Sequence, residues 1–164
     1  MKTFNLILIG ISLLVFSGYF LFCYKRWGIL KSISQSYFQL AQNEKWLFTF
    51  FMWTIALPLM IVGHTFLSVM AGVFLCYTGA AGDTKDDKAS ENVHVIGATG
   101  AIILGYSFLM HLSVNLKSVP LFVITLVCIL ASLFMYWEKT KNHTTWIEGI
   151  AYYAFVTGLL IKII

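Results

Sequence analysis

Long apolar stretches separated by short polar segments dominate the chain. The apolar stretches lie at about 4–23, 46–62, 65–81, 93–112, 118–137 and 145–162. A helix needs roughly 17–25 residues to cross the apolar core of a bilayer, and the six stretches have that length. They do not alternate in polarity as the strands of a membrane barrel do. The pattern therefore predicts an all-α polytopic membrane protein, a bundle of six transmembrane helices that forms a single domain over residues 1–164.

The segment 46–81 is too long for one span and short for two. Pro58 and then Gly63, His64 and Thr65 interrupt it near its middle. Proline and glycine end or bend helices, and a histidine is best accommodated at the membrane surface. We therefore expect the second and third spans to form a short helical hairpin.

The composition supports the membrane interpretation and excludes other classes. Hydrophobic residues make up 59% of the chain and charged residues 11%, against roughly 25% charged residues in soluble domains. The mean hydropathy is +0.82. A soluble domain of this size leaves much of its surface wet and could not hide so much apolar area. Soluble enzymes, nucleic-acid-binding modules, disordered tails and secreted disulfide domains are disfavoured, and no nucleic acid is expected as a partner.

The few charges are distributed unevenly between the two predicted membrane faces. Eight of the 11 Lys and Arg residues, and all seven Asp and Glu residues, fall on the face formed by the loops after the first, third and fifth spans. Loops rich in Lys and Arg stay in the cytoplasm, which makes this inner face cytoplasmic and is typical of a bacterial inner-membrane protein. Span ends on the same face carry four of the five tryptophans, Trp27, Trp46, Trp137 and Trp146.

The loop after the first span contains apolar residues at helical spacing. Leu30, Ile33, Tyr37 and Leu40 recur at intervals of three, four and three, which is typical of an amphipathic helix. We expect a short interfacial helix that lies in the membrane surface. An irregular loop that happens to contain apolar residues is the alternative.

Polar groups within or beside membrane spans are the first candidates for function, because burying them is costly. Glu148 lies about four residues into the sixth span, where it either has a partner or is a helix-start carboxylate stabilised by the helix dipole. His94 opens the fourth span one turn after Glu91, so both side chains share a helical face. On the inner face, the candidate polar cluster comprises Ser32, Ser34, Ser36, Glu91, His94, His143 and Glu148.

The same residues suggest a metal site that is incomplete. A carboxylate and an imidazole three residues apart can bind a metal, with Glu91 and His94 as the ligands and a third from His143 or Glu148. Two ligands are not a site, so no metal is expected, and without a P-loop or GxGxxG motif no other cofactor is expected either. His111 cannot join them, because it lies about 25 Å along the helix from His94.

Small residues at intervals of four indicate where helices touch. Such stripes let helix backbones approach closely, either within one chain or between two copies in a homo-oligomer. The predicted packing residues are Gly72 in the third span, Gly97, Ala101 and Gly105 in the fourth, and Ala154 and Gly158 in the sixth.

Short motifs along most of the chain carry a family resemblance. They are Ser-Ile-Ser-Gln-Ser-Tyr-Phe at 32–38, Trp-Leu-Phe at 46–48 with Trp53, Pro-Leu-Met-Ile at 58–61 and Val-His-Val-Ile-Gly-Ala at 93–98. The chain resembles small multi-span proteins of Bacteroidetes-type bacteria and their phages. More distantly it is similar to the DRAM/Frag-like six-span families of unknown function.

The resemblance points to a polar cluster rather than to an activity. It implies that the serines of the first loop and His94 share the inner face. Gln35 stands where the resemblance leads us to expect an acidic residue, so an acid-dependent role for that loop is not supported.

Three functions therefore stay open at this point. The first is an integral membrane protein that binds a membrane lipid, or a protein partner, through its inner-face polar cluster. The second is a metal-dependent membrane hydrolase that acts on lipids, with Glu91 and His94 as metal ligands. The third is a subunit of a channel or transporter.

Overall fold

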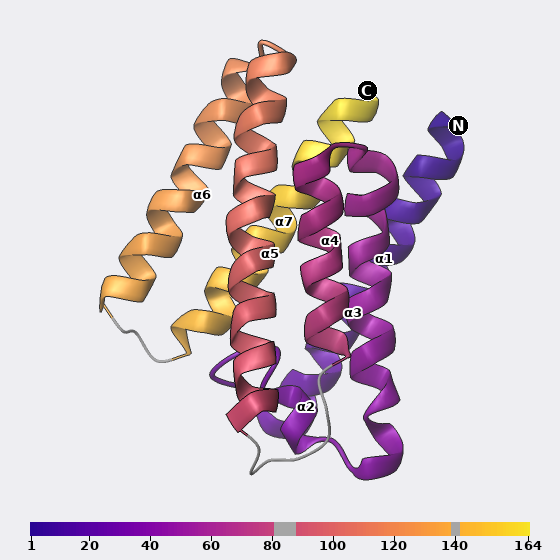
Figure 1. The fold of residues 1–164 in the computed structure, drawn as a ribbon, viewed down its shortest axis with the longest axis vertical. Coiled ribbons are helices and arrows are strands. Elements are labelled where there is room, and N and C mark those ends of the chain that lie inside the picture. The colour runs from indigo at the N-terminus through magenta and orange to yellow at the C-terminus, as the bar shows by residue number, and fades with distance from the viewer. Residues whose placement is uncertain (81–87, 139–141) are drawn as a thin grey trace.

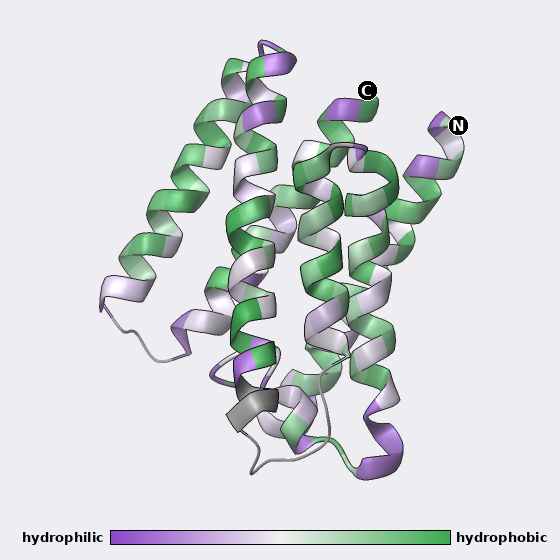
Figure 2. Cartoon of the chain, viewed as in Figure 1, coloured by the Kyte–Doolittle hydropathy of each residue, from purple (hydrophilic) through white to green (hydrophobic). Residues whose placement is uncertain are grey.

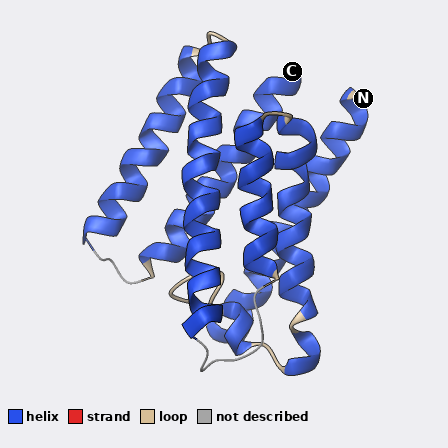
Figure 3. Ribbon diagram, viewed as in Figure 1, coloured by secondary structure: helices blue, strands red, loops and turns tan. Residues whose placement is uncertain are grey.

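The computed structural model describes the backbone of residues 1–80, 88–138 and 142–164, and the side chains of all of these except 88–91. Every described secondary-structure element is helical (Figure 3), so the all-α prediction is confirmed. The elements are α1 (Lys2–Trp27), α2 (Ser36–Gln39), the 3₁₀-helix η1 (Gln42–Glu44), α3 (Trp46–Pro58), the π-helix η2 (Leu59–Gly63), α4 (Phe66–Gly79), α5 (Lys88–Asn115), α6 (Val119–Glu138) and α7 (His143–Ile163).

The long helices run alternately up and down a bundle (Figure 1), and both chain ends lie at the same end of it. The opposite end carries α2 and the segment that precedes it. Hydrophobic residues fill the middle of the helices, whereas hydrophilic residues gather toward the two ends (Figure 2). This distribution matches the apolar core of a bilayer and its two polar surfaces.

Within the described residues, five helical segments are long and apolar enough to cross a membrane, as in a multi-pass membrane protein. They are Lys2–Trp27, Gln42–Gly63, Asn92–Asn115, Val119–Glu138 and His143–Ile163. The predicted third span corresponds to α4, which is apolar but has only 14 residues. At 1.5 Å per residue α4 is about 21 Å long, less than the roughly 30 Å of a bilayer core.

The hairpin predicted from Pro58 and Gly63 is formed by α3, η2 and α4. Proline lacks an amide hydrogen and disrupts the helical hydrogen-bond pattern, and the chain widens into the π-helix η2 directly after Pro58. His64 then adopts a left-handed backbone conformation, with φ of 57°. Thr65 caps α4 through its hydroxyl, which accepts a hydrogen bond from the Ser68 amide. The turn therefore follows from residues that stop one helix and start the next.

Helix α5 approaches α4 and α7 closely at glycines. A Cβ atom at Gly97 of α5 would clash with Thr78 Oγ1 and lie 3.1 Å from the Phe74 carbonyl of α4. Similar clashes would arise between Gly105 and Phe155 and between Gly158 and Leu109. On the other side of α4, Gly72 faces Met60. Among the alanines, the buried members of the predicted packing set are Ala101 and Ala154.

The segment after α1 differs from the predicted interfacial helix. Gly28, with φ of 75°, ends α1, and residues 28–35, here called the strap, form no helix. The helix that follows, α2, has only four residues. Ile33, Tyr37 and Leu40 are buried in the protein core. The short helix predicted after the first span is therefore present only as the four residues of α2, and the apolar side chains at helical spacing pack on the bundle.

Candidate functional site

The strap is fastened to the first turns of α7 by three hydrogen bonds. The Ile33 amide donates to Glu148 Oε2 at 2.5 Å. The Thr145 amide donates to the Lys31 carbonyl at 3.2 Å, and the Thr145 hydroxyl donates to the Leu30 carbonyl at 2.7 Å. Backbone groups of a non-helical segment at this depth need such partners. Glu148 thus holds together two segments that are 115 residues apart in the sequence.

A groove of about 700 Å³ lies where the strap meets α5, α6 and α7. Polar residues gather at one end of it, on the strap, on the second turn of α5 and on the first turns of α7. These residues are Lys31, Ser32, Ser34, His94, Thr144 and Glu148. The remaining lining on α5, α6 and α7 is mostly apolar, namely Val95, Ala98, Ile102, Ile103, Ile129, Leu133 and Ile147, with Thr99, Tyr106, Ser132 and Tyr136 among them. One groove therefore joins a polar end to a mostly apolar wall.

The structure brings four members of the predicted polar cluster to this groove, Ser32, Ser34, His94 and Glu148. Two of the serines also contact each other, since Ser32 Oγ and Ser34 Oγ are 3.1 Å apart. The groove reaches from His94 to Tyr106 along α5. Twelve residues of helix cover about 18 Å, so the lining extends well away from the polar end.

Two predicted residues, Ser36 and His143, stand apart from the groove lining. Ser36 is fully buried, and its hydroxyl donates to the Ile33 carbonyl at 2.6 Å and lies 2.7 Å from the Tyr19 hydroxyl. The His143 ring packs on Tyr136, which lines the groove, at a centroid distance of 6.2 Å. The side chain of Glu91 lies outside the described residues.

His94 lies in a box of aromatic rings. Its ring centroid is 5.4 Å from that of Tyr37, 5.2 Å from that of Phe38 and 5.8 Å from that of Phe48. Burial raises the pKa of the Tyr37 phenol above its ordinary value. Both nitrogens of His94 are buried and have no hydrogen-bond partner among the described residues. An unsatisfied buried polar group costs about 1–3 kcal/mol. Burial of the His94 ring therefore lowers the stability of the folded protein.

A metal centre has no complete ligand set in the described part of the chain. No three His, Cys, Asp or Glu side chains described by the structure come close enough to share a metal ion. The pair of ligands suggested by the sequence includes Glu91, whose side chain is outside that description. The geometry thus adds no support for a metal-dependent hydrolase.

A second, smaller cavity of about 50 Å³ lies inside the bundle behind the groove. It shares the wall residues Ser34, Ala98, Ile102 and Glu148 with the groove. Deeper in, Tyr152 also lines this cavity, and its hydroxyl is 2.7 Å from Ser12 Oγ. Glu148 and Ser34 therefore stand between an outer groove and an inner space.

The sequence did not indicate most of the groove lining. Lys31 and Thr144 at its polar end, and Ile129, Leu133 and Tyr136 on α6, line it as well. The α6 residues recur at intervals of four and three, a signal of a common helix face. That signal is the same for a face that contacts lipid and for one that lines a groove, so the sequence could not distinguish them.

No protein-family model, curated protein or solved structure matches this chain. Its function has to be argued from its own residues.

Proposed function

We propose that this protein binds a membrane lipid in the groove between the strap, α5, α6 and α7. The observation that carries the proposal is the lining, in which one groove joins a polar end to an apolar wall. A lipid has the same two parts, a polar headgroup and an apolar chain. The headgroup would contact the strap, and the chain would lie along α5 and α6.

The size of the groove supports a lipid of one leaflet. Its volume of about 700 Å³ is within the roughly 300–1,000 Å³ of sites for small molecules. The lining covers about 18 Å of α5, a little more than half of a bilayer core of roughly 30 Å. A chain in the groove would therefore reach from the membrane surface to about the midplane.

The proposal includes an orientation in the membrane. The alternating helices support a six-span arrangement in which α4 is a short third span beside α5 (Figure 1). The strap and its groove then lie on the face that carries most Lys and Arg residues, which the positive-inside rule places in the cytoplasm. The bound lipid would come from the cytoplasmic leaflet of a bacterial inner membrane.

The proposal is tested by placing a large side chain in the groove and by placing the same side chain on α5 outside the groove as a control. Thr99 is an exposed residue of α5 that lines the groove. Ser107 is an exposed residue two turns further along α5 and is not part of the lining. Thr99→Phe and Ser107→Phe introduce the same ring on the same helix, so Ser107→Phe controls for the added bulk.

Binding is measured with the purified full chain in nanodiscs that contain a phospholipid with a photoreactive group on its chain. We expect the lipid to label groove residues of α5 and α6, and Thr99→Phe to reduce this labelling several-fold while Ser107→Phe does not. Equal labelling of both variants and the wild type would mean that the label reports only the surrounding bilayer. In that case the groove is not a lipid site.

A further inference from the structure

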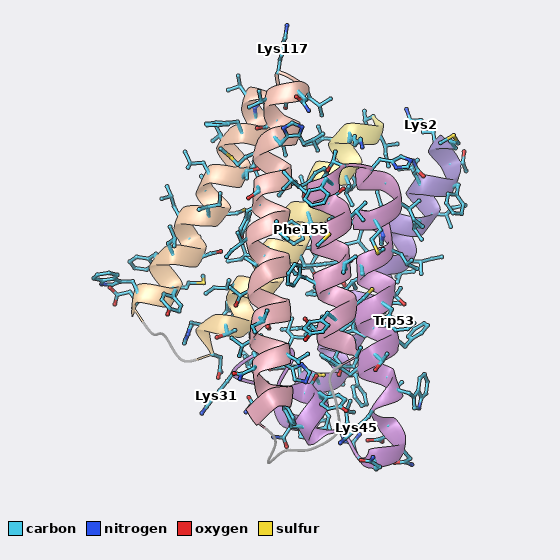
Figure 4. All side chains as sticks on the ribbon, in the orientation of Figure 1. Lys2, Lys31, Lys45, Trp53, Lys117 and Phe155 are labelled. Atoms are coloured by element: carbon cyan, nitrogen blue, oxygen red, sulfur yellow. The ribbon has the colours of Figure 1, made fainter. Side chains whose placement is uncertain are left out.

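Two opposite charges line the polar end of the groove. Lys31 is exposed on the strap, and Glu148 is on α7. They do not form an ion pair with each other, because the only ion pair within the described residues joins Arg26 and Glu44 at 2.8 Å. Figure 4 shows Lys31 at the strap end of the bundle, far from Lys2 and Lys117 at the other end. The groove thus presents an ammonium group and a carboxyl group that do not pair with each other.

We infer that the groove selects an aminophospholipid, whose headgroup carries a phosphate and a primary ammonium group. This inference rests on the proposed function and specifies its ligand. The phosphate would bind the Lys31 ammonium, and the headgroup ammonium would donate hydrogen bonds to the Glu148 carboxylate. Charge-assisted hydrogen bonds of both kinds are stronger than neutral ones.

The hydrogen-bonding capacity around the two charges fits this headgroup. An ionised carboxylate offers about four acceptor sites, and the Ile33 amide and the Ser34 hydroxyl use two of those of Glu148. The hydroxyl group of Thr144 lines the same end and can donate to phosphate oxygens. Every polar group of the headgroup therefore has a complementary group in the lining.

Other common headgroups fit these charges less well. A choline headgroup carries the same charges, but its quaternary nitrogen has no hydrogen to donate to Glu148. A glycerol headgroup can also place its phosphate on Lys31, but it has no ammonium group to offset the negative charge of Glu148, which is unfavourable. The expected order of affinity is ethanolamine, then choline, then glycerol, for lipids with identical chains.

The test is native mass spectrometry of the purified full chain titrated with these three lipids. We expect the ethanolamine lipid to bind about tenfold more tightly than the choline lipid, the ratio typical of one charge-assisted hydrogen bond. Glu148→Gln keeps an acceptor for the Ile33 amide and removes the negative charge. We expect this variant to fold normally and the ratio to fall toward one.

Two further measurements separate the contribution of the Lys31–phosphate contact from that of the apolar chain. Lys31→Ala weakens all three lipids by a similar factor, because each has a phosphate, whereas Lys2→Ala at the opposite end of the bundle changes nothing. Soluble phosphoethanolamine, which has the headgroup but no chain, does not displace the lipid at the same concentration. Displacement by this soluble compound would show that the apolar wall contributes no affinity, which contradicts the proposed function itself.

The results distinguish failure of the headgroup assignment from failure of the proposed function. If wild-type protein binds the ethanolamine and choline lipids equally, or if Glu148→Gln keeps the preference, lipid binding stands and the aminophospholipid assignment is wrong. If none of the three lipids binds to the wild type, both proposals are wrong.

Discussion

The bond between the Ile33 amide and Glu148 Oε2 makes a sharp prediction about stability. Replacing Glu148 by leucine removes the acceptor and leaves the amide of a residue that is only 9% exposed without a partner. A hydrogen bond to a charged group contributes about 1.5–3 kcal/mol, and an unsatisfied buried donor costs a similar amount. These values describe overlapping effects, so we expect Glu148→Leu to lower the free energy of unfolding by about 3 kcal/mol.

Two variants isolate this effect from the loss of a charge and from the change in size. Glu148→Gln keeps an oxygen acceptor and should lose only about 1 kcal/mol, the difference between a charged and a neutral hydrogen bond. Glu138 is an exposed carboxylate at the end of α6. Glu138→Leu should change stability by less than about 0.5 kcal/mol, as is usual for surface positions.

The measurement is unfolding by SDS in mixed micelles, followed by circular dichroism. Limited trypsin digestion provides a local readout, because Lys31 lies on the strap. We expect faster cleavage after Lys31 in Glu148→Leu than in Glu148→Gln or the wild type. If Glu148→Leu is as stable and as resistant to trypsin as the wild type, the hydrogen bond between Ile33 and Glu148 does not fasten the strap to α7.

Two further predictions concern the interior. His94→Phe should leave the free energy of unfolding unchanged or raise it by up to about 2 kcal/mol in SDS unfolding, because phenylalanine fits an aromatic box and has no nitrogens to satisfy; a loss of stability would show that His94 has a partner. Gly97→Leu should lower the free energy of unfolding by about 3 kcal/mol, because the larger side chain overpacks against α4. Gly10→Leu, where a Cβ meets nothing within 4 Å, should change it by less than about 1 kcal/mol. Equal effects of the two substitutions would contradict the close approach of α4 and α5.

The helical spans could be predicted because their signal is local. Apolar runs of about 20 residues give long helices in lipid, where the backbone must satisfy its own hydrogen bonds. The hairpin was predictable for the same reason, since Pro58 and the Gly63–Thr65 segment act on their own neighbours in sequence. The bounds of the predicted second span, 46–62, agree to within one residue with those of α3 and η2, which together run from Trp46 to Gly63.

The strap could not be predicted, because its conformation depends on partners distant in sequence. Apolar residues at helical spacing look the same whether they face lipid or core. Tyr37 is buried against Phe48 of α3 and His94 of α5, and the Ile33 amide is held by Glu148 of α7. The same limit applies to the serines: Ser34 lines the groove while Ser36 is buried against Tyr19, a difference set by the path of the strap.

The groove and the fastening of the strap both depend on the Glu148 carboxylate, so a Glu148 variant can change lipid binding in two ways. Glu148 accepts from the strap backbone and also lines the groove, so its removal alters the shape of the site as well as its charge. Loss of lipid binding in Glu148→Leu would therefore not identify a headgroup contact, because the strap that carries Lys31 and Ser34 would be released at the same time. Only a variant that keeps the acceptor and removes the charge separates the two roles. A headgroup preference that disappears in Glu148→Gln, at nearly unchanged stability, can be assigned to the carboxylate itself.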